Sequence, residues 1–302
     1  MSPSHAQPET GVLPNVRVGS RRSVSLPYHA PFDAEGLLRF LGDRTIPGVE
    51  EVRGSTFTRS LSTEHGPGVV SLTTDDDHVR LDVALGDERS LRSVVRIGRS
   101  LFDVEVDPVA VARTLRKDPA LRPLVLTHPG VRVPGAADGF ELAVRAIVGQ
   151  QVSVAAARTM LGRIAGRFGT PLEGRVPLAF PSAEALAEAP FEELGIIGRR
   201  AGAIRRIAAM VASGELDLSG ASDPDETVGT LLELDGIGPW TAGYIRMRAL
   251  RDPDAFVASD LGVRHGFERL GLDARPRAIL ARAEAWRPWR AYATMLLWRL
   301  GA

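Results

Sequence analysis

A glycine-rich turn at the start of a predicted helix is the first feature of this sequence that suggests chemistry. The turn runs Gly236-Ile237-Gly238 and is followed by Pro239, a residue type favoured at the first position of a helix. Backbone N–H groups at such a helix start point outward and, together with the helix dipole, form a site for an anion such as phosphate. The spacing therefore predicts a phosphate-binding turn, although a plain corner between two helices has the same pattern.

A carboxylate follows this turn at a short distance. Asp260 lies twenty residues beyond Trp240, within the largely apolar stretch 256–263. An acid at a helix start has two interpretations: it caps the helix, or it is held in a dry cleft where its charge stabilises a developing cation. Taken alone, the pattern favours the capping role.

Composition excludes several classes of protein. The chain has 302 residues, 44% of them hydrophobic and 25% charged, which is typical of a globular protein with two or three domains. It has no cysteine, so disulfides, thiolate nucleophiles and Cys-ligated iron–sulfur clusters are excluded. No apolar run could span a membrane and the start does not resemble a secretory signal, so we expect a cytoplasmic protein.

Charge and histidine content say little about partners. Lysine and arginine together number 37, as do aspartate and glutamate, so the net charge does not indicate a nucleic-acid partner. The six histidines show no ligand spacing, and we therefore expect no metal held by side chains.

The N-terminal third of the chain alternates short strand-like runs with turn signals. Strands are expected over residues 16–27, 50–60, 69–73 and 78–85, with turns at 66–68 and 75–77. One helix, over residues 34–41, has Asp33 as its expected N-cap. These patterns predict a small α/β domain with an antiparallel sheet.

From residue 88 onward the hydrophobic periodicity is helical. Helices are expected over residues 88–102, 108–117, 139–168, 183–189, 199–213, 224–232, 239–248, 260–267, 276–285 and 288–300. The connections are short, as in helical bundles. The expected fold class is therefore α+β, with a small N-terminal antiparallel-sheet domain followed by an all-α part.

Four stretches, in this order, resemble the helix-hairpin-helix DNA glycosylase superfamily, and most of all its bacterial 3-methyladenine DNA glycosylase II group. They are residues 139–155 (GFELAVRAIVGQQVSVA), residues 194–201 (LGIIGRRA), the turn with its acid over 231–260, and the tryptophan-containing segment 286–298. The likeness covers residues 25–300 and is strong from 139 onward. It implies a helical core of two subdomains built around a helix-hairpin-helix.

The resemblance also assigns roles to individual residues. Asp260 falls on the catalytic carboxylate of the family. Gly236, Gly238 and Thr241 fall where the hairpin grips the DNA backbone, and Gln151 falls on the loop residue that enters the duplex. The base pocket is implied to contain Trp240, Tyr244, Trp298, Phe40 and Gln150.

The implied activity is that of a monofunctional base excision repair glycosylase acting on alkylated purines such as 3-methyladenine and 7-methylguanine. A base within a duplex must be flipped out before its glycosidic bond can be reached. Cleavage passes through an oxocarbenium-like state, and one buried carboxylate can stabilise this state, activate the water, or do both. Alkylated purines are cationic, so stacking on aromatic rings favours them. Trp240 stands where bifunctional relatives have a Schiff-base lysine, so no lyase activity is expected.

The resemblance further implies how the chain is divided and what it binds. Composition and periodicity predict a disordered N-terminus over residues 1–15 and the sheet domain over 16–102. The resemblance implies the helix-hairpin-helix domain over 139–252 and a second helical domain made of 103–138 plus 253–302. The implied partner is damaged double-stranded DNA, bound by a monomer, which in a bacterium places the protein on the nucleoid. No cofactor and no iron–sulfur cluster are expected, while a monovalent cation at the hairpin carbonyls is a possible addition.

Two alternatives remain open. A non-catalytic helix-hairpin-helix protein would bind DNA with the glycine turn but would need neither Asp260 nor the aromatic residues. A glycosylase for deaminated bases, such as hypoxanthine or uracil, would keep the site and change the lesion. Gln151 replaces the apolar wedge of the best-known relative, and Arg246, Arg248 and Arg264 are candidates for phosphate contacts.

Overall fold

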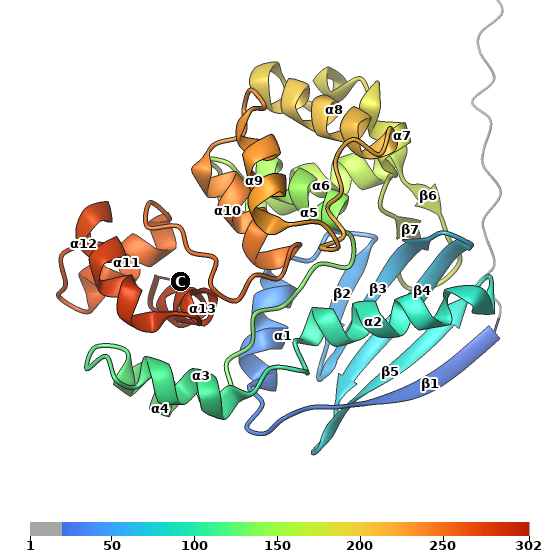
Figure 1. The fold of residues 1–302 in the computed structure, drawn as a ribbon. Helices are drawn as coiled ribbons and strands as arrows, with labels where there is room; N and C mark the ends of the chain where they lie inside the picture. The colour runs from blue at the N-terminus through green and yellow to red at the C-terminus, as the bar shows by residue number, and fades with distance from the viewer. Residues whose placement is uncertain (1–19, 302) are drawn as a thin grey trace, which may run out of the picture.

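The computed structural model describes residues 20–301, in which a five-stranded antiparallel sheet precedes a helical part (Figure 1). The sheet has the order β1-β5-β4-β3-β2, with strands β1 Ser20–Pro27, β2 Glu50–Arg53, β3 Thr56–Thr63, β4 Gly66–Thr74 and β5 His78–Leu85. The α+β class expected from the sequence is confirmed. The predicted disordered segment 1–15 lies outside the described residues.

One face of the sheet is apolar and carries a helix. Along β5 the alternate residues Val79, Leu81, Val83 and Leu85 are each at most 2% exposed. Helix α2, Leu91–Phe102, packs on this face after the short 3-10 turn η1, Glu88–Ser90. Helix α1, Ala34–Asp43, lies beside β2 and β3, and its N-cap is Asp33, as expected.

Two expectations about the sheet are wrong. The strand expected over 50–60 is two strands, β2 and β3, joined by a tight turn in which Gly54 has a φ of +57°. The turn expected at 66–68 lies instead at Glu64 and His65, and Gly66 begins β4. Gly68 is a packing residue, because a Cβ there would come within 2.7 Å of Leu85 on β5.

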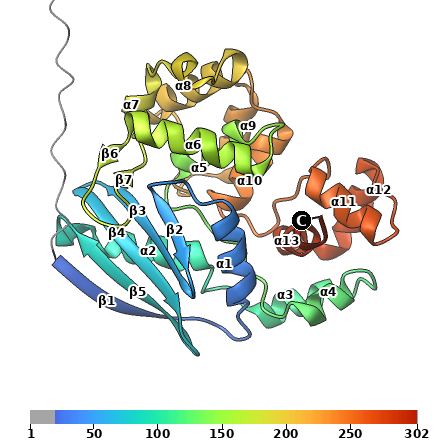
Figure 2. The same cartoon turned by 180° about the vertical axis from the view of Figure 1, so that it is seen from behind.

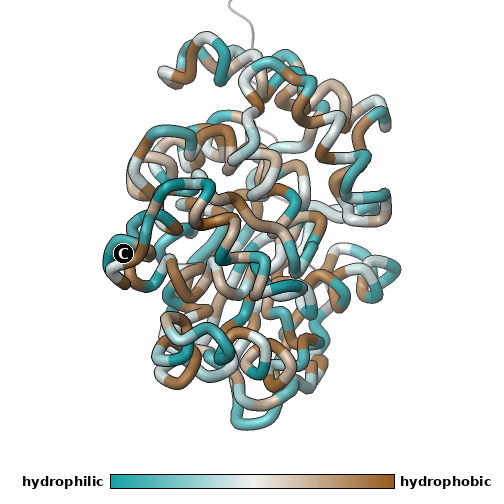
Figure 3. Tube along the Cα trace, turned by 60° about the vertical axis from the view of Figure 1, so that its left-hand side comes forward, coloured by the Kyte–Doolittle hydropathy of each residue, from teal (hydrophilic) through white to brown (hydrophobic). Residues whose placement is uncertain are grey.

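The helical part contains eleven helices within the described residues. They are α3 Pro108–Leu115, α4 Arg122–Thr127, α5 Gly139–Val148, α6 Val154–Phe168, α7 Ala183–Ala187, α8 Gly198–Ala212, α9 Pro224–Leu232, α10 Pro239–Arg248, α11 Leu261–Arg269, α12 Pro276–Ala283 and α13 Arg290–Gly301. Two further 3-10 turns are η2 Phe191–Leu194 and η3 Glu284–Trp286. Hydrophobic and hydrophilic stretches alternate along the trace in Figure 3, as expected for helices with one buried face.

Three details of the helical part differ from the expectation. The single helix expected over 139–168 is broken at residues 149–153 into α5 and α6, and helix α4 was not expected. A short hairpin of β6, Thr170–Pro171, and β7, Leu178–Ala179, interrupts the helices. It packs on β3, where Ser60 Oγ donates to the carbonyl of Leu178 at 2.7 Å.

The buried apolar residues form two cores. One joins the sheet and α1–α4 to α11–α13, and the other lies among α5–α10. Helices α3 and α4 accordingly lie beside the C-terminal helices in both Figure 1 and Figure 2, although more than a hundred residues separate them along the chain. The domain boundaries given above remain a prediction. None of the helices within residues 20–301 has the length and apolar character that a membrane span requires.

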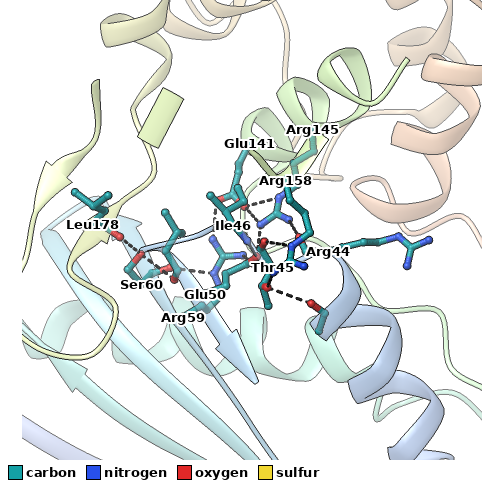
Figure 4. A network of polar contacts seen from close by, with 12 residues as sticks. Arg44, Thr45, Ile46, Glu50, Arg59, Ser60, Glu141, Arg145, Arg158 and Leu178 are labelled. Atoms are coloured by element: carbon teal, nitrogen blue, oxygen red, sulfur yellow. Dashed lines mark hydrogen bonds and ion pairs between the residues drawn. The ribbon is translucent and has the colours of Figure 1, made fainter. Parts of the chain in front are cut away.

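A buried ring of four charges joins the sheet to α5 (Figure 4). Arg59 of β3 donates to Glu50 at 2.8 Å and to Glu141 of α5 at 2.6 Å. Arg145, one turn further along α5, pairs with the same two carboxylates at 2.6 and 2.7 Å. Two positive and two negative groups balance, whereas loss of one would leave a buried charge unpaired. The ring fixes α5, and with it the loop that follows, against the sheet.

Asp103 joins α2 to α13 through a buried carboxyl. It accepts hydrogen bonds from the Tyr292 hydroxyl at 2.9 Å and from the backbone N–H of Val133 at 3.1 Å. Burial raises the pKa of Asp103 to about 6, against the lowering effect of these hydrogen bonds and of the nearby Arg132. At a pH between the ordinary pKa of an aspartate and this raised pKa, Asp103 therefore keeps its proton in the folded protein but has lost it in the unfolded chain.

This carboxyl makes the stability depend on pH. Because the pKa of Asp103 is higher in the folded protein than in the unfolded chain, the contribution of this residue to stability is expected to fall as the pH rises from about 4 to about 6. Asp103→Asn cannot ionise, so the unfolding free energy of this variant relative to wild type should rise by about 2–3 kcal/mol between about pH 4.5 and about pH 7.5. Urea unfolding at the two pH values measures this difference. An equal difference at both would contradict the assignment.

Candidate active site

The carboxylate of Asp260 is held by three N–H donors. Oδ1 accepts from the backbone N–H of Val263 at 2.8 Å and from Trp298 Nε1 at 2.7 Å, while Oδ2 accepts from Trp240 Nε1 at 2.6 Å. The residue is 7% exposed. It is both the N-cap of α11 and a carboxylate in a cleft, so the two interpretations of its position hold together. All three donors are neutral, so they orient the carboxylate without cancelling its charge.

Aromatic rings from three helices surround this carboxylate. On α10, Trp240 and Tyr244 stack with ring centroids 5.4 Å apart. Trp298 of α13 lies 6.2 Å from Tyr244 and stacks on Phe40 of α1 at 5.9 Å with an interplanar angle of 3°. The structure thus brings four of the predicted pocket residues together around Asp260.

The carboxylate and the four rings line one cleft of about 690 Å³. It lies among α1, α5, α10 and α13, and its volume is within the range of small-molecule sites. A site of this kind accepts a flat, ring-shaped ligand and places a negative charge beside it. The chemistry open to it is the stabilisation of a positive charge that develops on the ligand.

The hairpin between α9 and α10 contains two glycines with different roles. Gly236 has a φ of +88°, and a Cβ there would lie 3.1 Å from Ala203 and from the carbonyl of Arg199. Gly238 has an ordinary φ of −99°, and a Cβ on it would meet nothing within 4 Å. The fold therefore needs glycine at 236, whereas at 238 the space above the N-terminus of α10 is open to a ligand.

Gln150 fastens the loop after α5 to this hairpin. Its Nε2 donates to the backbone carbonyl of Gly236 at 2.9 Å and to Thr241 Oγ1 at 2.8 Å. The backbone carbonyl of Gln150 accepts a hydrogen bond from Arg200 Nη2 at 2.6 Å. The side chain therefore lies against the hairpin and does not line the cleft with the aromatic residues. The next residue, Gln151, is exposed with a φ of +55° at the tip of the loop.

The structure places Thr241, Arg246 and Arg264 in three different environments. The side chain of Thr241 is 1% exposed and is occupied by Gln150, so only its backbone remains for an anion. Arg246 pairs with Asp225 and Asp252, and Arg264 is exposed.

The phosphate contact expected of Arg248 is wrong, because this residue is 5% exposed. Its guanidinium lies inside the fold and donates to the hydroxyl of Tyr244 at 2.8 Å. Sequence reasoning missed this inward position, although the spacing contained a signal. Trp240, Tyr244 and Arg248 recur every four residues, so they lie on one face of α10.

Two family profiles match the chain. Residues 23–138 match the AlkA N-terminal domain, and residues 144–291 match the HhH-GPD superfamily base excision DNA repair protein.

Curated relatives match most of the chain. It is 43% identical over 279 residues to a probable bifunctional transcriptional activator/DNA repair enzyme AlkA of Mycobacterium tuberculosis, covering 91% of this chain and 56% of that protein. It is 33% identical over 282 residues to DNA-3-methyladenine glycosylase 2 of Escherichia coli, covering 91% of this chain and 96% of that protein. The chain thus spans about half the length of the mycobacterial relative.

A similar fold is found among solved structures. The 3-methyladenine DNA-glycosylase from Archaeoglobus fulgidus superposes with a TM-score of 0.80 at 23% identity, covering 93% of this chain and 98% of that one. At this identity the likeness shows the fold alone.

The two hairpin glycines should respond differently to alanine. Gly236→Ala forces a side chain into the left-handed region and should lower the unfolding free energy by about 1–2 kcal/mol. Gly238→Ala has space and an ordinary φ, so its loss should stay below about 1 kcal/mol. Urea unfolding of both variants measures this. A loss at Gly238 equal to that at Gly236 would show that the fold requires both glycines.

Proposed function

The chain belongs to the DNA-3-methyladenine glycosylase 2 (AlkA) family of the HhH-GPD superfamily, and we propose that it is a monofunctional DNA glycosylase that hydrolytically excises alkylated purines from duplex DNA. The observation that carries this proposal is the Asp260 carboxylate, held by neutral donors within an aromatic cleft. The names of the relatives and the chemistry of the site point to the same reaction.

The proposed mechanism begins with a damaged base turned out of the duplex into the cleft. There the rings of Trp240, Tyr244, Trp298 and Phe40 supply flat apolar surfaces for stacking. As the glycosidic bond breaks, positive charge develops on the sugar, and the uncancelled charge of Asp260 stabilises it. The same carboxylate can orient or deprotonate the attacking water.

DNA is held, in this proposal, by the hairpin and the neighbouring loop. The open space over Gly238 lets a phosphate approach the backbone N–H groups at the start of α10. Gln151 enters the stack left by the turned-out nucleotide, and Gln150 and Arg200 support it from behind. The substrate is damaged double-stranded DNA.

Further properties follow from the same proposal. Trp240 occupies the place of a Schiff-base lysine, so no strand-cleaving lyase activity is proposed. Asp260 and water suffice for hydrolysis, so the reaction needs no cofactor. A monovalent cation at the hairpin carbonyls remains a prediction, and no step of the proposed mechanism passes through it. We propose that the protein works as a monomer on DNA in the cytoplasm.

The cleft is the feature that distinguishes a glycosylase from a protein that only binds DNA. Such a protein would use the hairpin alone, and Asp260 would serve only as the cap of α11. Release of base, measured separately from DNA binding, distinguishes the two functions.

Asp260→Asn should abolish most base release while leaving DNA binding intact. The amide keeps an oxygen for capping Val263 but loses the negative charge that stabilises the developing cation, so release of 3-methyladenine should fall by at least about 100-fold. Single-turnover release from methylated duplex DNA, with DNA affinity as the control, measures both effects. Equal release by both proteins would place the catalytic group elsewhere, and no release by a wild type that binds DNA would contradict the activity.

A further inference from the structure

Arg248 places a positive charge beside the aromatic rings of the cleft. It lies on α10, lines the same cleft as Asp260 and is 5% exposed. Its guanidinium donates to the hydroxyl of Tyr244 at 2.8 Å, to the carbonyl of Gly135 at 3.2 Å and to the carbonyl of Pro134. Because these acceptors are all neutral, they hold the guanidinium in place without cancelling its charge.

Because Arg248 is buried, water screens its charge only weakly within the cleft. Burial lowers the pKa of Arg248, and the cations Arg44 and Arg145 lower it further. An arginine nevertheless keeps its proton in a folded protein. Glu50 and Glu141 also line this cleft, but their charges are already balanced by Arg59 and Arg145 in the buried ring.

Cations of the chain itself already lie against the aromatic rings. The guanidinium carbon of Arg248 is 4.9 Å from the ring centroid of Phe40 and 5.6 Å from that of Tyr244. The guanidinium carbon of Arg44 is 3.9 Å from the same Phe40 ring. A cationic base stacked here would therefore meet fixed charges of its own sign, which reduces the advantage that stacking on aromatic rings would otherwise give it.

Asp260 and Arg248, two of the charged residues that line the cleft, act differently on different lesions. Asp260 attracts a cationic alkylpurine and Arg248 repels it, whereas a neutral base feels little of either. We propose that Arg248 is a specificity-determining residue, whose charge lowers the preference of the cleft for cationic alkylpurines over neutral purine lesions such as hypoxanthine. This inference rests on the proposed glycosylase function and concerns the choice of base at the same site.

The test compares two bases and two substitutions. Single-turnover release of 3-methyladenine, which is cationic in DNA, and of hypoxanthine, which is neutral, is measured on duplex DNA. The ratio of the two rates removes effects common to both reactions. Arg248→Met, which removes the charge, should raise this ratio about tenfold. Arg248→Gln, which is neutral but keeps hydrogen-bond donors, replaces the Met variant if that variant does not fold, with the same expectation.

Arg132 offers a matched control. It is 1% exposed, donates only to backbone carbonyls, and its guanidinium carbon lies 4.7 Å from the Phe32 ring, but it does not line the cleft. Arg132→Met therefore removes a comparable buried arginine elsewhere in the fold. It should lower stability while the ratio stays within about twofold of wild type.

Several results would overturn the inference. They are an unchanged ratio in the neutral variants of Arg248 and an equal change in the Arg132 control. If the wild type releases no measurable hypoxanthine, neutral Arg248 variants that release 3-methyladenine no faster than wild type would also contradict it, because Arg248 would then not repel the cationic base. A wild type that binds DNA and releases neither base would instead refute the proposed function itself.

Discussion

The hydrogen bonds to the Asp260 carboxylate are the interaction on which the site depends. One donor comes from α10, one from α13 and one from the backbone of α11, so the acid ties three helices together at a single point. Each indole that holds the carboxylate also presents its ring to the cleft, and the same two tryptophans thus build the pocket wall and orient the charge. Because the donors are neutral, the charge remains available to a ligand.

The sheet domain contributes to the site through a second constraint. Phe40, on α1, stacks on Trp298, and Arg44 lies over the Phe40 ring. The carbonyl of Arg44 accepts a hydrogen bond from Arg145 at 2.9 Å, and Arg145 belongs to the buried ring of four charges. One polar network therefore fixes the wall of the cleft and, through α5, the loop that carries Gln151. This continuity explains how parts of the chain distant in sequence form one site.

The sequence predicted best those elements that have a proline at their start or a regular alternation of apolar residues. The bounds of α9, α10 and β5 agree with the expectation, since proline begins each of the two helices and apolar residues alternate along the strand. The break at 149–153 was missed because helical periodicity continues across it. The turn at 66–68 was misplaced because Gly68 serves close packing between strands, which local sequence does not reveal.

The site was predictable only in part. The turn, the acid and the aromatic residues could be placed by their motifs and by the family resemblance. Arg248 was misplaced despite its spacing from Trp240 and Tyr244, because arginines on helices are usually solvated and two of its acceptors, the carbonyls of Pro134 and Gly135, lie more than a hundred residues earlier. Gln150 was expected beside the base, but tertiary contacts with the hairpin determine its position.

The central claim is that two indole N–H groups orient the Asp260 carboxylate for its proposed catalytic role. The most direct test removes these N–H groups without removing the rings. Trp240→Phe and Trp298→Phe keep aromatic walls but each deletes one hydrogen bond to a charged group, a loss of about 1.5–3 kcal/mol. The account predicts that single-turnover base release falls by about 10- to 100-fold in each variant while DNA affinity is retained. Release at the wild-type rate by both variants would contradict it.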